Sequence, residues 1–231
     1  MKNHQPSVIL FDVNETLLDM TPLKKEIKNL LGSRKGFRIW FGMLLQYSLV
    51  DNCINQYHDF ASIADATLEI AAKSLEKTID KKEKKAALAV LKELKAHTDV
   101  KKGLKLLKEN GFRLAALTNS PESTLTEQLN NSKLSAYFEL TLSIDTIRKY
   151  KPALETYNWA AEQLSVAPAD IIMVAAHGWD IAGALQAGLQ AAFIERKGQS
   201  LYPLSTKPHF AGKDLIEIAN AIILQKKINK S

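Results

Sequence analysis

The sequence predicts an α/β fold in which a parallel sheet forms the core and a helical cap domain follows the first strand. From residue 101 onward, short apolar segments alternate with segments of helical periodicity. This alternation is typical of a parallel sheet covered by helices on both faces. An earlier apolar segment, 7–12, has the length and composition of a buried strand. Only helical periodicity lies between these parts. We therefore predict a Rossmann-like core from residues 1–18 and 96–231, and a cap from residues 19–95.

The inserted cap is expected to contain four helices. Thr21 is the expected N-cap of the first helix, with Pro22 at its first position. In the second helix, apolar side chains recur at the spacing that places them on one face. The four expected helices are 22–31, 36–50, 58–74 and 82–96.

The remaining core elements are expected to form βαβ units. Asn110 and Gly111 are typical of a helix end, and Pro152 of a helix start. Ligands of such folds bind outside the carboxyl ends of the strands, where an insert after the first strand would cover them. The expected strands are 112–120, 138–145, 170–177 and 190–196, and the expected helices are 101–109, 151–164, 179–189 and 213–227.

Composition excludes several classes of protein. The 31 Lys and Arg residues exceed the 25 Asp and Glu residues by six, but the lysines are scattered along helical faces. This pattern indicates solvated helices, and no nucleic-acid-binding motif accompanies it, so no nucleic-acid partner is expected. Cys53 is the single cysteine, which excludes an internal disulfide and favours a reducing compartment. No segment is apolar over the length of a membrane span. We therefore predict a cytoplasmic protein without a membrane partner.

Polar side chains follow successive predicted strands. Because the carboxyl ends of parallel strands meet at one edge of a sheet, these side chains are expected to converge. They include carboxylates, hydroxyls, amides, an ammonium and an imidazole. The residues are Asp12, Asn14, Thr16, Thr118, Asn119, Ser120, Lys151, His177 and Asp180.

Four segments that contain these residues resemble the ordered motifs of the haloacid dehalogenase superfamily. They read "FDVNETLLD", "LTNS", "KYKP" and "AAHGWDIAGA". Together with the insert and the stretch "HTDVKKGLKLLKENGFRLAALTNS", they are most similar to the type II L-2-haloacid dehalogenases. The resemblance covers nearly the whole chain. Each motif alone is weak evidence, whereas four in this order with the insert are strong.

The resemblance implies a role for each matching residue. Asp12 matches the nucleophile, a carboxylate that is ionised at neutral pH and forms an ester with substrate. Thr16 matches the residue that steadies the nucleophile, and Thr118 one whose hydroxyl bonds to it. Lys151 matches the lysine that keeps neighbouring carboxylates charged. The remaining matches are Asn119 in substrate binding, Tyr157 and Trp179 near substrate, and Asp180, which holds the lysine and orients water.

Two positions distinguish a dehalogenase from the phosphatases of the same superfamily. Those phosphatases have a second aspartate two residues after the nucleophile, which protonates the leaving alcohol. This chain has Asn14 there, and an amide has no such proton. Ala176 occupies the position of an acidic Mg²⁺ ligand and offers no oxygen. We therefore predict metal-independent hydrolysis of a short 2-haloacid to a 2-hydroxy acid, without cofactor.

Two other positions depart from the dehalogenase pattern. The resemblance implies a substrate-contacting arginine in the cap, and Phe41 is aligned with it. Phe41 would either pack within the cap or form an apolar wall against substrate. His177 replaces an asparagine of the last motif. Its ordinary pKa suits a base for the water, but a hydrogen-bond donor to substrate or a structural histidine is equally consistent with the sequence.

Alternative functions remain open at this point. A hydrolase of another substrate class, such as a phosphatase, would depend on Mg²⁺ despite Ala176. An inactive binding protein on the same fold would be insensitive to the substitution Asp12→Asn. The expected partner is a short halogenated carboxylic acid, and the resemblance implies a homodimer.

Overall fold

A six-stranded parallel sheet forms the centre of the computed structural model, which describes residues 6–229. Its strand order is β3-β2-β1-β4-β5-β6. The strand β1 lies in the middle, with Val8 to Phe11 completely buried between β2 and β4. The strands are β1 (Val8–Phe11), β2 (Arg113–Thr118), β3 (Leu140–Ser143), β4 (Ile171–Ala175), β5 (Gln190–Ile194) and β6 (Phe210–Gly212).

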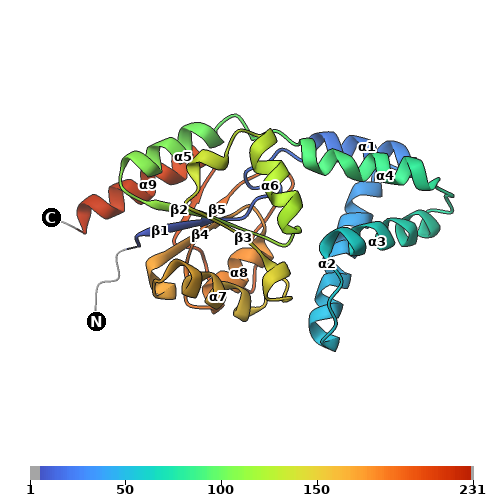
Figure 1. Ribbon diagram of the computed structural model, residues 1–231. Coiled ribbons are helices and arrows are strands. Elements are labelled where there is room, and N and C mark those ends of the chain that lie inside the picture. The colour runs from blue at the N-terminus through green and yellow to red at the C-terminus, as the bar shows by residue number, and fades with distance from the viewer. Residues whose placement is uncertain (1–5, 230–231) are drawn as a thin grey trace.

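Helices cover both faces of this sheet. Helices α5 and α9 pack together on one face, whereas α7 and α8 lie on the other, and α6 lies beside β3 (Figure 1). The inner strands β1, β2, β4 and β5 therefore have no face exposed to water, as their apolar sequences require. The helices are α5 (Val100–Glu109), α6 (Glu122–Asn131), α7 (Leu154–Leu164), α8 (Gly178–Gln186) and α9 (Leu215–Ile228).

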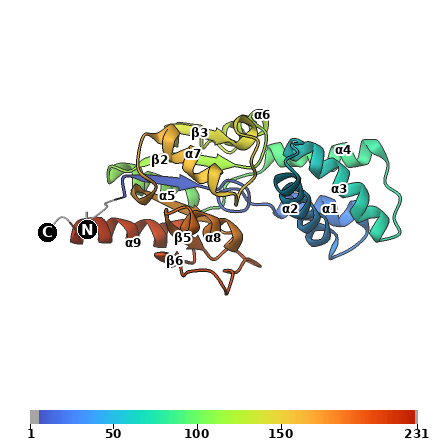
Figure 2. The same ribbon diagram turned by 90° about the horizontal axis from the view of Figure 1, so that it is seen from below.

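A separate bundle of helices lies beyond the carboxyl end of β1. Figures 1 and 2 show α1 to α4 grouped beside the core, connected to it by the segments that precede α1 and α5. The indole of Trp40 is completely buried between α2 and α3, and its Nε1 donates to the carbonyl of Ala64 at 2.9 Å. The elements are α1 (Thr21–Leu31), α2 (Gly36–Ile54), α3 (Phe60–Ser74), α4 (Lys81–Ala89) and the 3-10 helix η1 (Val90–Glu93).

The predicted α/β class with a parallel sheet is confirmed, and the bundle occupies the place expected for the insert. The exact limits of the two domains, 1–18 with 96–231 and 19–95, stay a prediction. Within residues 6–229, no helix is both long and apolar enough to cross a bilayer.

Several expected helix boundaries differ from the structure: the helix expected over 36–50 extends to Ile54, and the one expected over 179–189 ends at Gln186. Thr21 is the first helical residue and not the cap, because its backbone N–H donates to Oδ1 of Asp19 at 2.9 Å. The expected helix 82–96 stops as an α-helix at Ala89 and continues as η1. The helix expected from residue 151 begins at Leu154. Lys151 precedes a proline, which disfavours helical backbone, and its N–H instead donates to Oδ1 of Asn119 at 3.0 Å.

Candidate active site

Asp12 lies where the central strand β1 ends. Its backbone N–H donates to the Val174 carbonyl at 3.0 Å, which extends the pairing with β4 to the first residue beyond β1. Its side chain is almost buried, with 5% of the residue exposed. Nζ of Lys151 donates to Oδ1 at 2.8 Å, and the Thr16 hydroxyl donates to Oδ2 at 2.6 Å. The sheet thus holds a carboxylate in a fixed orientation at its carboxyl edge.

Thr16 connects this carboxylate to the neighbouring strand end. The backbone N–H of Ala176 donates to the Thr16 hydroxyl at 2.9 Å, so the hydroxyl proton is directed at Asp12. Burial alone would raise the pKa of Asp12. The positive charge of Lys151 and the hydrogen bond from His177 outweigh the effect of burial and hold the pKa of Asp12 well below its usual range. Asp12 is therefore ionised at neutral pH, the state that a nucleophile requires.

Lys151 is buried between two carboxylates. Besides Asp12, its Nζ donates to Oδ2 of Asp180 at 2.6 Å and to the Leu117 carbonyl at 3.1 Å. Burial would lower the pKa of Lys151, but the charges of Asp12 and Asp180 raise it. One ammonium therefore neutralises part of the charge of two carboxylates that water cannot reach.

Asp180 is completely buried at the start of α8. Its Oδ1 accepts a hydrogen bond from the Tyr157 hydroxyl at 2.6 Å, and Tyr157 is itself fully buried. Burial and the charge of Asp12 raise the pKa of Asp180 despite the nearby Lys151. In the structure, Tyr157 thus contacts the last-motif carboxylate, whereas the sequence assigned it to substrate.

His177 lies between two carboxylates at the N-terminus of α8. Its Nδ1 is 3.2 Å from Oδ2 of Asp12, and its Nε2 is 3.2 Å from Oε2 of Glu15. Burial favours the neutral ring, but the hydrogen bonds and charges of Asp12 and Glu15 raise the pKa of His177 to about 9. The expectation of a near-neutral pKa is therefore wrong, because the ring is an imidazolium that donates from both nitrogens.

Glu15 belongs to the site, although the sequence analysis did not select it. Its backbone has a φ of 66°, the left-handed region that few residues other than glycine adopt. This conformation turns its side chain inward, where only 3% of the residue is exposed. Lys24 of α1 forms an ion pair with Glu15, and Nε2 of Gln199 donates to it at 2.6 Å. The sequence feature that could have indicated this role is the position of an acidic residue between Asn14 and Thr16.

Two aromatic rings stack against the imidazolium. Phe41 of α2 stacks against His177 at 6.2 Å between ring centroids, and Trp179 stacks on it at 5.2 Å. Phe37 in turn stacks on Phe41 at 5.4 Å. Phe41 therefore reaches out of the helical bundle and forms an apolar wall at His177. Stacked aromatic faces also favour the charged form of the ring.

The loop residues after β1 and β2 form a second hydrogen-bonded group. Nδ2 of Asn14 donates to Oγ of Ser120 at 3.0 Å, and Oδ1 of Asn14 accepts from Gln128 at 2.9 Å. The Thr118 hydroxyl accepts from the Ser120 N–H at 3.1 Å. The expected hydrogen bond from Thr118 to Asp12 is not formed between these described residues; Asp12 instead contacts Thr16, His177 and Lys151.

Asn119 has a buried donor without a protein partner. Its Oδ1 accepts from the backbone N–H of Lys151, while its Nδ2 forms no hydrogen bond with any of residues 6–229. A buried amide N–H without a partner costs free energy, and a bound ligand atom would relieve that cost. Asn119 is thus the residue with a free donor for a substrate oxygen or halogen.

The positive charge beside Asp12 comes from side chains. Among residues 6–229, no group of three or more His, Cys, Asp or Glu side chains is placed to hold a metal ion. Between the carboxylates of Asp12 and Asp180 lies the ammonium of Lys151. Positive charge at this position is thus supplied by a side chain.

Comparison with known proteins identifies the family. The family model described as haloacid dehalogenase-like hydrolase matches residues 9–194, which include every motif named above. The chain belongs to the haloacid dehalogenase-like hydrolases. This hydrolase is 30% identical over 191 residues to (S)-2-haloacid dehalogenase 4A of Burkholderia cepacia, covering 82% of this chain and 83% of the relative. It is 31% identical over 192 residues to (S)-2-haloacid dehalogenase 1 of Pseudomonas sp. (strain CBS-3), covering 81% and 83%.

Solved structures agree on the fold. The L-2-haloacid dehalogenase of Xanthobacter autotrophicus with chloropropionic acid covalently bound superposes with a TM-score of 0.86 at 20% identity, covering 94% of this chain and 98% of that one. A dehalogenase with an intermediate complex gives a TM-score of 0.87 at 26% identity, covering 94% and 97%. The resemblance of this hydrolase to the L-2-haloacid dehalogenases is thereby confirmed.

Proposed function

We propose that this hydrolase cleaves the carbon–halogen bond of a 2-haloacid and releases the 2-hydroxy acid. The observation that carries the proposal is the setting of Asp12, an ionised carboxylate at the end of β1. Its Oδ2 is held by Thr16 and His177, whereas Oδ1 has Lys151 as its single partner. Oδ1 therefore accepts fewer hydrogen bonds than Oδ2, which leaves it a lone pair for attack on the substrate. The curated relatives with 30% and 31% identity, both (S)-2-haloacid dehalogenases, support this reaction.

The first step forms an ester. Oδ1 of Asp12 attacks the carbon that bears the halogen, and the electron pair of the carbon–halogen bond leaves with the halide. Halide needs no proton at departure. The amide of Asn14, which is engaged by Ser120 and Gln128, has no acidic proton to supply. This arrangement suits a halide better than an alcohol as leaving group.

The second step hydrolyses the ester. Water attacks the carboxyl carbon of Asp12, and the bond between this carbon and the former Oδ1 breaks. The former Oδ1 leaves as the hydroxyl oxygen of the 2-hydroxy acid. Esterification removes the charge of Asp12, one of the effects that raise the pKa of His177. The imidazolium then releases its proton to solvent more readily, and Nδ1 of the neutral ring faces the ester. We assign His177 as the base that takes the proton of the attacking water, with Asp180 holding Lys151 in place.

The reaction requires no metal ion or cofactor in this proposal. The ammonium of Lys151 and the imidazolium of His177 supply the positive charge around Asp12. Substrate binds in part through the free Nδ2 of Asn119, while Phe41 and Trp179 form apolar walls beside His177. Assembly into a homodimer stays a prediction.

The decisive experiment measures halide release from L- and D-2-chloropropionate, chloroacetate and fluoroacetate in the presence of EDTA. The wild-type protein is expected to release halide from at least one acid, and Asp12→Asn from none. A single turnover in water enriched in heavy oxygen should place the label in Asp12 and not in the product. Label in the product would exclude the ester. Absence of halide release from every acid, including those described next, would overturn the function.

A further inference from the structure

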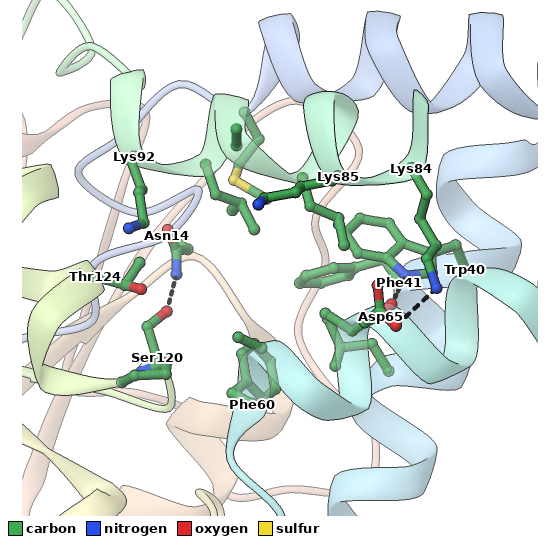
Figure 3. A pocket seen from close by; sticks show the side chains of 18 of the residues that line it. Asn14, Trp40, Phe41, Phe60, Asp65, Lys84, Lys85, Lys92, Ser120 and Thr124 are labelled. Atoms are coloured by element: carbon green, nitrogen blue, oxygen red, sulfur yellow. Dashed lines mark hydrogen bonds and ion pairs between the residues drawn. The ribbon is translucent and has the colours of Figure 1, made fainter. Parts of the chain in front are cut away.

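A cavity of about 670 Å³ lies between the helical bundle and the core. Helices α2, α3 and α4 with η1 form one side of it. The other side consists of core residues that include Asn14, Ser120 and Thr124 (Figure 3). A 2-haloacid of three carbons has only about six non-hydrogen atoms, whereas cavities of this size hold ligands several times larger. The short acid predicted from the sequence leaves most of this volume unused.

The cavity adjoins residues that neighbour the nucleophile in sequence or contact the site. Asn14 lies two residues after Asp12 and is hydrogen-bonded to Ser120. Phe41, which stacks on His177, also lines the cavity. Asp12 and Lys151 themselves do not line it. The cavity thus begins at the loops that hold the catalytic residues and extends away from them into the bundle.

Its walls are mainly apolar. The side chains that face it from the bundle and the adjoining segment include Met20, Trp40, Leu44, Phe60 and Leu88. Such walls stabilise an apolar ligand by removing its surface from water. Five apolar side chains from different elements therefore favour an aliphatic or aromatic substituent over a polar one.

The charges at the cavity favour an acid. Asp65 and Glu69 line it and share the ammonium of Lys84, whose Nζ lies 2.7 Å from Oδ2 of Asp65. Lys81 and Lys92 line it as well, so lysines outnumber acids in the lining. Lys85 also lines the cavity and has no ion-pair partner in the part of the chain that the structure describes. Figure 3 shows its ammonium directed into the cavity. The net positive charge attracts an anionic ligand and disfavours a cationic one.

We propose that the substrate of this hydrolase is a 2-haloacid with a large apolar substituent, such as a medium-length alkyl chain or an aryl group, that occupies this cavity. The halogenated carbon lies at Asp12, and the substituent passes Asn14 and Phe41 into the bundle. The cleavage of such a substrate rests on the proposed function, whereas its binding in the cavity does not. Binding and cleavage are therefore tested separately.

Binding is measured by titration calorimetry with unhalogenated ligands, which cannot react. Octanoate is expected to bind at least about tenfold more tightly than propanoate, because its longer chain removes more apolar surface from water. Octylammonium, with the same chain and the opposite charge, should bind more weakly than octanoate. Equal affinity for octanoate and propanoate, or tighter binding of octylammonium, would overturn the proposal.

Two substitutions in α3 test where the alkyl chain of octanoate binds. Ala61 and Ala66 are both exposed, but only Ala61 lines the cavity. Ala61→Phe should abolish the advantage of octanoate and leave propanoate binding unchanged. Ala66→Phe is the matched control and should behave as wild type. Equal effects of the two substitutions would place octanoate elsewhere and contradict the assignment. Circular dichroism verifies that both variants fold.

Turnover separates this inference from the proposed function. Halide release from 2-bromooctanoate should exceed that from 2-bromopropionate in kcat/KM, and only Ala61→Phe should remove the difference. Release from both acids without a length preference would retain the function and overturn the cavity assignment. A third outcome is possible, in which Ala61→Phe abolishes the preference for the longer ligand but neither acid releases halide. This outcome would support the cavity as a carboxylate-binding site and overturn the proposed function.

Discussion

Nε2 of His177 lies 3.2 Å from Oε2 of Glu15, so the imidazolium beside the nucleophile is held by a second buried carboxylate. Glu15 in turn forms an ion pair with Lys24 of α1. A chain of charged contacts therefore runs from Asp12 through His177 and Glu15 to the helical bundle. Its members alternate in sign, which makes each charge depend on its neighbours.

The first prediction concerns the pH dependence of catalysis. Glu15→Gln removes one of the two charges that raise the pKa of His177 to about 9. The limb of the kcat/KM profile that reports His177 should therefore move to lower pH. An NMR titration of the His177 ring measures the same change directly. Glu93→Gln, an exposed acid of η1, is the control. An unchanged ring titration in Glu15→Gln would contradict the assigned contact.

The second prediction concerns stability. The pKa of His177 is about 9 in the folded protein and 6.5 when unperturbed. A group with a raised folded-state pKa stabilises the protein fully below its unfolded pKa, and this contribution disappears as pH rises through the folded value. The free energy of unfolding should therefore decline between pH 6.5 and about 9. Denaturant titrations across this range should show a smaller decline for Glu15→Gln than for wild type.

The third prediction concerns Lys151. Lys151→Met leaves the carboxylates of Asp12 and Asp180 buried without their shared cation. Removing one partner of a buried ion pair costs about 3–5 kcal/mol, which urea denaturation measures. The double substitution Lys151→Met with Asp180→Asn removes one of the two remaining charges and should recover part of the loss. Equal stability of the single and double variants would show that charge is not the cause.

The fourth prediction concerns Tyr157, whose hydroxyl donates to Oδ1 of Asp180. Tyr157→Phe leaves that buried oxygen with one donor fewer, at a cost of about 1–3 kcal/mol in the free energy of unfolding. Because Tyr157 acts through Asp180 and does not line the cavity, kcat should fall while KM stays nearly constant. A rise in KM at unchanged kcat would favour the direct substrate contact assigned from the sequence.

The sheet and most site residues could be predicted because their signals are local. The strand "IIMVA" at 171–175 is apolar throughout, and polar residues follow it directly. Helix α6 was missed because Leu125 and Leu129 are its only apolar side chains, too few for a visible period. Strand β6 has three residues and depends on pairing with β5.

The charge state of the site could not be predicted from the sequence. An acid in the loop after β1 would ordinarily be solvated, and nothing local indicates that Glu15 turns inward to meet His177. The pKa of His177 depends on this contact between residues 162 positions apart. Likewise, the contact of Phe41 with His177 joins the bundle to the core, and periodicity within α2 carries no information about it.

The last prediction tests the assignment of His177 as the base of the second step. His177→Asn retains a polar side chain but no group that accepts a proton at neutral pH. Ester formation uses Asp12 and should continue, whereas hydrolysis should slow by about 10²–10⁴-fold. Intact-protein mass spectrometry after mixing with a 2-haloacid should then show the mass of the carboxyalkyl group, which is the haloacid without its halide, retained on Asp12. His177→Asn with Asp12→Asn should show no added mass. Rapid full turnover by His177→Asn would assign the base elsewhere, with Asp180 the nearest remaining carboxylate bound to Lys151.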